Sequence, residues 1–332
     1  MSSTTPVESD EPLIVDVDVI EVPPEIAGRS LGQIAWRRLR RDKVAMVGGI
    51  FIILLIVTAI LAPVITKILG IDPYDFHTDL LDPETTFPPG TGGISGEHWL
   101  GIEPVSGRDI LARVLYGARI SLSIAILATI VSVLIGVVLG SIAGFFGGKT
   151  DTVISRIMDI FLAFPVLLFS IALLFVFGNV QQLGPFTGVT VRAGLLVVII
   201  GVFSWAYIGR VMRGQVLSLR EKEFIDASRS LGAGNGRLLA KELLPNLMAP
   251  ILVYTTLTIP TNILTEAALS FLGVGIQEPD PSWGKMLSTA QATVQIDPWY
   301  MLFPGLAIFI SVLAFNLFGD GLRDALDPKS LR

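Results

Sequence analysis

An uncharged stretch near the N-terminus, residues 44–66, reads VAMVGGIFIILLIVTAILAPVIT. As an α-helix these 23 residues would be about 34 Å long, and the apolar core of a bilayer is about 30 Å thick. The stretch also contains no charged group that would have to leave water. It therefore predicts a first transmembrane helix.

Five further apolar stretches follow along the chain. We expect spans at about residues 120–142, 160–178, 193–208, 243–272 and 299–319. The composition agrees, because 52% of the 332 residues are hydrophobic and only 16% are charged, whereas soluble domains average about 25% charged residues. The sequence therefore predicts an all-α integral membrane protein with six transmembrane helices and both termini on one side.

The basic residues predict which side that is. Eighteen of the 24 Lys and Arg residues fall in segments that share a side with the N-terminus, and six fall elsewhere. Cytoplasmic loops are enriched in positive charge, so both termini, including residues 321–332, are expected in the cytoplasm. Two extracytoplasmic segments then remain, at residues 67–118 and about 273–298.

The acidity of the chain belongs to its N-terminal tail. Residues 1–28 hold seven acids and no base, and the rest of the chain has 24 bases against 22 acids. A secretory signal starts basic and then turns apolar, so this tail does not resemble one. The alternation of Val15, Val17 and Val19 with acids would suit an edge strand, but the acidic, proline-containing composition favours disorder. We assign residues 1–43 to a cytoplasmic tail and basic flank.

Several kinds of chemistry are excluded by residue content. The chain has no cysteine and two histidines, which excludes disulfides, thiolate sites and a cysteine nucleophile and argues against a histidine-rich metal centre. Gly148-Lys149-Thr150 looks like the end of a phosphate-binding loop, but the first glycine of that motif would fall on Ala143 and a predicted span precedes it where a strand is required. We therefore expect no enzyme activity, metal or cofactor in this chain.

A cytoplasmic segment between the fourth and fifth spans has the pattern of a docking element. Residues 223–246 read EFIDASRSLGAGNGRLLAKELLPN. Apolar and small residues repeat at helical spacing in two groups, first Phe224, Ala227, Ser228 and Leu231, then Leu238, Leu239 and Leu243. The glycines between them tolerate positive φ, which predicts two short amphipathic helices joined by a sharp turn, with Pro245 at the start of the fifth span.

This segment resembles the EAA loop of ABC-transporter permeases, where it forms the coupling helix that docks into the ATP-binding subunit. At residues 223–245 the resemblance rests on Glu223, Asp226, Ala227, Ser228, Leu231, Gly232, Leu244 and Pro245. The chain departs from the pattern at two positions, with Asp226 where the family has Glu and Ser228 where it has Ala.

Five other segments resemble one branch of that family, the second ("C-type") permeases of dipeptide, oligopeptide and nickel importers. They are HWLG with GRD at 98–109, YGARISL at 116–122, DIFLAFP at 159–165, TEAALSFLG with PSWG at 265–284, and FNLFGDGLRDALDP at 315–328. Glu103 stands where Asp is usual, and the acidic tail lies outside the pattern. The resemblance covers roughly residues 30–332.

The resemblance implies a type I ABC-importer permease fold, with its core at residues 119–320, in a bacterial cytoplasmic membrane. It implies import of di- or oligopeptides together with a sister permease in a heterodimer, two ATP-binding subunits that hold ATP and Mg, and an extracytoplasmic solute-binding protein. Surrounding lipid is the other expected partner, and nucleic acid is not expected. The open alternatives are nickel, glutathione or another small solute as cargo, and a stand-alone secondary transporter, which would need an ion-coupling site.

Three residues are candidates for the translocation path. Glu266 lies inside an apolar run, where a charge must be hydrated or paired; the alternative is a structural carboxylate that caps a loop or pairs with Arg108 or Lys285. Asp159 is expected at the membrane interface, paired with Arg156 or with a neighbouring helix. Pro165 removes a backbone hydrogen bond and could kink a span at a gate or simply distort it.

One glycine pattern predicts packing. Gly136, Gly140 and Gly144 recur at four-residue spacing in the second span and form a small-residue face. Such a face lets a second transmembrane helix approach closely.

Overall fold

The computed structural model describes residues 31–177, 180, 182–183 and 186–326; the predictions for the acidic tail and for residues 327–332 lie outside this part. Its elements are α1 (Leu31–Leu39), α2 (Lys43–Leu69), η1 (Thr78–Leu80), α3 (Ile110–Phe146), α4 (Gly148–Ala163), α5 (Val166–Phe177), β1 (Gln182–Leu183), β2 (Phe186–Thr187), α6 (Val189–Leu219), α7 (Glu223–Ser230), α8 (Asn235–Arg237), the π-helical turn η2 (Leu238–Leu243), α9 (Leu244–Phe271), α10 (Trp283–Gln291) and α11 (Pro298–Leu326). The all-α prediction is confirmed, with one small antiparallel hairpin, β1–β2, between α5 and α6.

Within the described residues, five helical segments are long and apolar enough to cross a membrane: α2, α3, α6, residues 235–271 and α11. The third predicted span, residues 160–178, is different. It is a pair of helices, α4 and α5, bent by 83° at the break between them. The bend follows from Pro165, because the residue before a proline is pushed out of the helical region, and Phe164 indeed has extended angles (φ −76°, ψ 132°).

The helices also extend past the predicted spans. The fourth span was expected at residues 193–208, but α6 continues to Leu219, so the expected cytoplasmic link is shorter and part of it is helix. The segment of residues 67–118 is non-helical only between Gly70 and Asp109, apart from the short turn η1. Apolar composition locates a span, but it does not show where the helix continues into water.

Capping residues set both ends of α2. The Asp42 carboxylate accepts hydrogen bonds from the backbone N–H groups of Val44 (2.9 Å) and Ala45 (3.1 Å), which satisfies donors that a helix start leaves free. Gly70 ends the helix with φ +70°, a left-handed conformation that glycine adopts without strain. The predicted span therefore has defined ends in the sequence.

The glycine face of α3 packs against α6. A Cβ at Gly136 would clash with the Ile208 side chain, one at Gly140 with the Gly209 carbonyl oxygen, and one at Gly144 with the Arg213 carbonyl oxygen. The small-residue prediction is confirmed, and the helix that it admits is α6.

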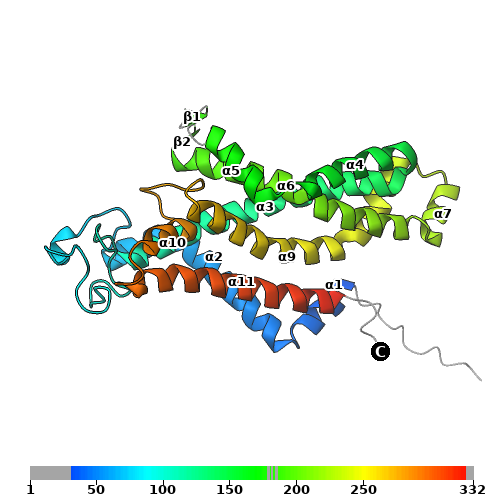
Figure 1. Cartoon of the computed structure of the whole chain (residues 1–332). Coiled ribbons are helices and arrows are strands. Elements are labelled where there is room, and N and C mark those ends of the chain that lie inside the picture. Colours follow the sequence, from blue (N-terminus) through cyan, green and yellow to red (C-terminus); the bar gives the residue numbers. More distant parts are fainter. Residues whose placement is uncertain (1–30, 178–179, 181, 184–185, 327–332) are drawn as a thin grey trace, which may run out of the picture.

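Figure 1 shows a long bundle with distinct ends. The non-helical residues 70–109 and α10 lie at one end, which we call the loop end. At the other, the α7 end, lie α7, α1 and the end of α11. Buried side chains from α2, α3, α9, α10 and α11 form one core cluster, and α3, α5, α6 and α9 contribute to a second. The first and last described helices thus meet at the end that carries α7.

Candidate functional site

The helix α7 is held against the bundle by one side chain. Ile225 is fully buried and packs with Val216 of α6, Leu243 of η2 and Leu247 of α9. Burying an isoleucine contributes about 1.5–3 kcal/mol, so this contact fixes α7 in place. Ile225 does not belong to the helical pattern that the sequence shows here, because that pattern, which includes Phe224 and Leu231, marks the opposite, exposed face.

That exposed face carries the predicted docking residues. Leu231 is 90% exposed and Phe224 is 37% exposed, Ala227 is also exposed and Ser228 is half-buried. Asp226 lies on the same surface, 3.5 Å from Arg229. An apolar side chain as exposed as Leu231, at the end of a fixed helix, marks a surface suited to contact with another protein.

The turn after α7 is built around Gly232. The N–H of Gly232 donates to the carbonyl of Arg229 (2.9 Å), and the N–H of Ala233 donates to the carbonyl of Ser228 (3.1 Å). This is the Schellman arrangement, which requires a left-handed residue directly after the helix, and Gly232 has φ +84°. The predicted glycine turn is confirmed.

The second predicted amphipathic helix is not a separate element. Residues 235–271 form one continuous helical segment, with α8, η2 and α9 joined end to end. Leu244 and Pro245 are exposed within it, and Pro245 takes the first turn of α9. The expectation of a separate second helix is wrong, because the π-helical turn η2 joins α8 directly to α9. The placement of Pro245 at the start of the fifth span is confirmed, since a proline fits the first turn of a helix.

Two ion pairs join α4 to α6 close to this surface. Arg210 of α6 contacts Asp159 at 2.5 Å, and Arg156 lies 3.9 Å from the same carboxylate. One turn further along α6, Arg213 binds Asp151 through two nitrogens, with Nη2 at 2.6 Å from Oδ2. The predicted pairing of Asp159 with a nearby base is confirmed. Pro165 is exposed, at the bend beyond Ala163.

Glu266 is enclosed by protein. It is 0% exposed, and its Oε1 accepts a hydrogen bond from Ser270 (2.7 Å), whose oxygen in turn accepts from the N–H of Ile276 (3.1 Å). These contacts fasten the loop after α9, as the loop-capping alternative predicts. The suggested pairing with Arg108 is wrong, because Arg108 binds other acids, and among the described residues no ion pair joins Lys285 to Glu266.

Residues 136–332 match the family of binding-protein-dependent transport system inner membrane components, and residues 30–89 match the N-terminal transmembrane domain of oligopeptide transport permease C. The chain belongs to this transport family. It is a multi-pass membrane protein and a permease component of an ABC importer.

Three relatives align with most of this permease. It is 43% identical over 295 residues to the dipeptide transport system permease protein DppC of Alkalihalophilus pseudofirmus, with 89% of each chain covered. It is 44% identical over 301 residues to the oligopeptide transport system permease protein OppC of Bacillus subtilis, with 90% of each covered. It is 42% identical over 298 residues to the glutathione transport system permease protein GsiD of Escherichia coli, with 89% of each covered.

A solved structure shows the same fold. The MetNI methionine ABC transporter, in an inward-facing conformation, contains a chain that aligns with a TM-score of 0.51 and 20% identity, covering 66% of this permease and 98% of that chain. This confirms the predicted importer-permease fold.

At the loop end the permease contains a charge cluster that is buried except for Glu278, whose side chain is 37% exposed. It consists of Glu103, Arg108, Arg113, Glu278 and Tyr300. Arg113 contacts Glu103 at 2.5 Å and Glu278 at 3.1 Å, Arg108 contacts the same two acids at 2.8 and 2.7 Å, and the Tyr300 hydroxyl donates to Glu103 (2.6 Å). The cluster therefore joins the loop before α3 to the loop after α9 and to the start of α11.

The cluster is electrostatically satisfied. Burial by itself raises the pKa of the Glu278 carboxyl, but Arg113 and Arg108 outweigh it, so the pKa lies below its usual value. Burial opposes the charge of Arg108, yet Glu103 and Glu278 raise its pKa overall. Charged groups removed from water are stable only when paired in this way. In the sequence these residues lie up to 197 positions apart, and only the close pair Glu103 and Arg108 signals the cluster.

Proposed function

We propose that this permease is the membrane-spanning subunit of an ATP-driven, binding-protein-dependent importer that moves di- or oligopeptides across the bacterial cytoplasmic membrane. In this assignment it forms a heterodimer with a sister permease, receives cargo from an extracytoplasmic solute-binding protein, and is driven by two separate ATP-binding subunits that hold ATP and Mg. The same assignment expects no cofactor in this chain.

The α7 surface carries this proposal. Ile225 fixes the helix, the Gly232 turn sets its direction, and Phe224, Ala227 and Leu231 are left exposed. The segment thus has a rigid attachment and an unpartnered apolar face at the same end as α1. We propose that Glu223, Asp226, Ala227, Ser228, Leu231 and Gly232, with Leu244 and Pro245 beside them, form the coupling site for an ATP-binding subunit.

Two further observations support the cargo and the orientation. The three relatives described above are named for dipeptide, oligopeptide and glutathione transport, and glutathione is itself a small peptide. The 18 to 6 division of basic residues favours a cytoplasmic α7 end. The assignment of Asp159, Pro165 and Glu266 to the translocation path stays a prediction.

Reconstitution tests the proposal. The permease is purified with the other subunits, placed in liposomes with ATP inside, and given a labelled dipeptide with the solute-binding protein outside. We expect uptake that requires hydrolysable ATP and the binding protein together. Uptake that continues without ATP, driven by an ion gradient, would instead identify a secondary transporter.

A further inference from the structure

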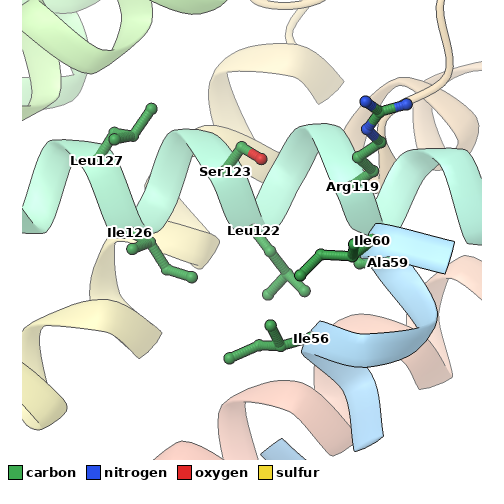
Figure 2. Close-up of a pocket in the computed structure, with 8 residues that line it drawn as sticks. All are labelled: Ile56, Ala59, Ile60, Arg119, Leu122, Ser123, Ile126 and Leu127. Atoms are coloured by element: carbon green, nitrogen blue, oxygen red, sulfur yellow. The ribbon is translucent and has the colours of Figure 1, made fainter. Parts of the chain in front are cut away.

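A groove between α2 and α3 contains a single charged side chain. It has a volume of about 370 Å³ and is lined by Ile56, Ala59 and Ile60 of α2 and by Arg119, Leu122, Ser123, Ile126 and Leu127 of α3. Figure 2 shows Leu122 and Ile126 pointing toward α2, while Arg119, Ser123 and Leu127 follow one another along α3. The lining includes one cation, one hydroxyl and no acid.

The guanidinium of Arg119 is open to a ligand. Arg119 is exposed, and among the described residues no hydrogen bond or ion pair engages its side chain. The two basic residues that precede it most closely in the sequence, Arg108 and Arg113, are both held by Glu103 and Glu278. Arg119 is therefore the cation that lines this groove and remains available.

The depth of the groove matters as much as the charge. Arg119 shares the groove with Ala59 and Ile60 of α2, which precede the end of the uncharged run at Thr66 by six or seven residues. At 1.5 Å per residue this is about 10 Å of helix. Arg119 itself directly precedes the second predicted span, residues 120–142, and a charge beside such an apolar wall is costly in lipid unless it reaches water or a charged ligand.

The face of α3 that carries Arg119 continues toward the α7 end. Ser123, Leu127, Ile130, Leu134 and Val138 follow at three- and four-residue spacing, and all are exposed. A second groove of about 420 Å³ begins on this face and is completed by Leu239 and Leu243 of η2 and by Leu244 of α9. One stripe of α3 thus leads from a cationic groove near the loop end to the helical segment that follows α7.

We propose that Arg119 binds the carboxylate of the cargo as it enters the translocation path, which makes it a specificity-determining residue for anionic peptide ends. This inference rests on the proposed function. Charge complementarity carries it: every peptide cargo with a free C-terminus has a terminal carboxylate, the groove has one available guanidinium, and a guanidinium and a carboxylate form paired hydrogen bonds. The apolar walls of the groove suit the rest of a short peptide.

Charge variants provide the first test, in the complete transporter reconstituted in liposomes with saturating binding protein and the dipeptide alanylphenylalanine. We expect Arg119→Gln to reduce uptake at least tenfold and Arg119→Lys to keep it within about threefold of wild type. The matched control is Lys67→Gln, which removes an exposed cation at the end of α2 and should leave uptake unchanged. Wild-type uptake by Arg119→Gln overturns the inference.

Cysteine chemistry keeps the inference testable if Arg119→Gln fails to assemble, because the native chain has no cysteine. Ser123→Cys lies one turn away in the same groove and should react with a membrane-impermeant methanethiosulfonate, at least threefold more slowly when the dipeptide is present. Two results overturn the inference. One is that Ser123→Cys reacts no more than the wild-type complex given the same reagent, which would place the groove against lipid or the sister permease. The other is that the dipeptide gives no protection. If the wild-type transporter takes up no dipeptide at all, the proposed function fails instead.

Discussion

Arg113 shows how a single side chain organises the loop end. It is fully buried and bridges Glu103 to Glu278, so it joins loops that are far apart in the sequence. Replacing it by an apolar residue leaves Glu103 buried with less compensation, and breaking a buried pair costs about 3–5 kcal/mol.

We therefore expect Arg113→Met to lower the thermal unfolding midpoint of the transporter in detergent by several degrees. Arg156→Met is the matched control, because the Arg156 side chain is 80% exposed and 3.9 Å from its acid, and exposed pairs contribute about 1 kcal/mol or less. Equal midpoints for the two variants would contradict the structural role of Arg113.

Glu278 gives the cluster a pH dependence of known sign. Its pKa is lowered in the folded state, so the charged carboxylate stabilises the fold above the ordinary Glu pKa of about 4.3. That contribution is lost as the pH falls through the lowered value. Glu278→Gln should therefore lower the unfolding midpoint at pH 7, and the difference from wild type should shrink below about pH 4. A difference that grows with acidity would contradict this assignment.

At the scale of elements, the contact between α3 and α6 depends on glycine. Gly140 lies against the carbonyl of Gly209 and the Met212 side chain, so any larger residue must push the helices apart. We expect Gly140→Leu to abolish recovery of monodisperse permease from membranes, because overpacking of such a close contact has no low-energy rearrangement. Gly194→Leu, on α6 with no described residue within 4 Å of its Cβ position, should be recovered like wild type.

The parts of these elements that are set by residues close together in the sequence could be predicted, and the parts that are set by contacts between distant segments could not. Apolar runs are local features and predicted the spans, and the glycine spacing in α3 correctly predicted a close helix contact. The continuity of residues 235–271 was missed, since Pro245 signals a helix start without showing what precedes it. Ile225 and the Arg113 cluster depend on contacts between distant segments, and apart from the close pair Glu103 and Arg108 no pattern in one sequence records them.

At the scale of the whole molecule, the orientation in the membrane can be measured directly. Thr85, at the loop end, and Asn235, at the start of α8, are both exposed, and the chain has no native cysteine. In intact cells a membrane-impermeant maleimide should label Thr85→Cys and leave Asn235→Cys unlabelled until the cells are broken. Labelling of Asn235→Cys in intact cells would reverse the orientation proposed from the basic residues.

The central claim is that α7 and its turn form the contact through which ATP hydrolysis drives this permease. It is tested most directly by measuring how much ATP-binding subunit co-purifies with Gly232→Asp permease. An aspartate at φ +84° strains the turn by about 1–3 kcal/mol and adds a charge to an apolar contact, while nothing else in the described part of the chain lies within 4 Å of that Cβ position. The account predicts a variant that still pairs with its sister permease but loses the ATP-binding subunits and uptake, whereas Asp226→Glu keeps both. Full retention of the ATP-binding subunits and full uptake by Gly232→Asp would contradict it.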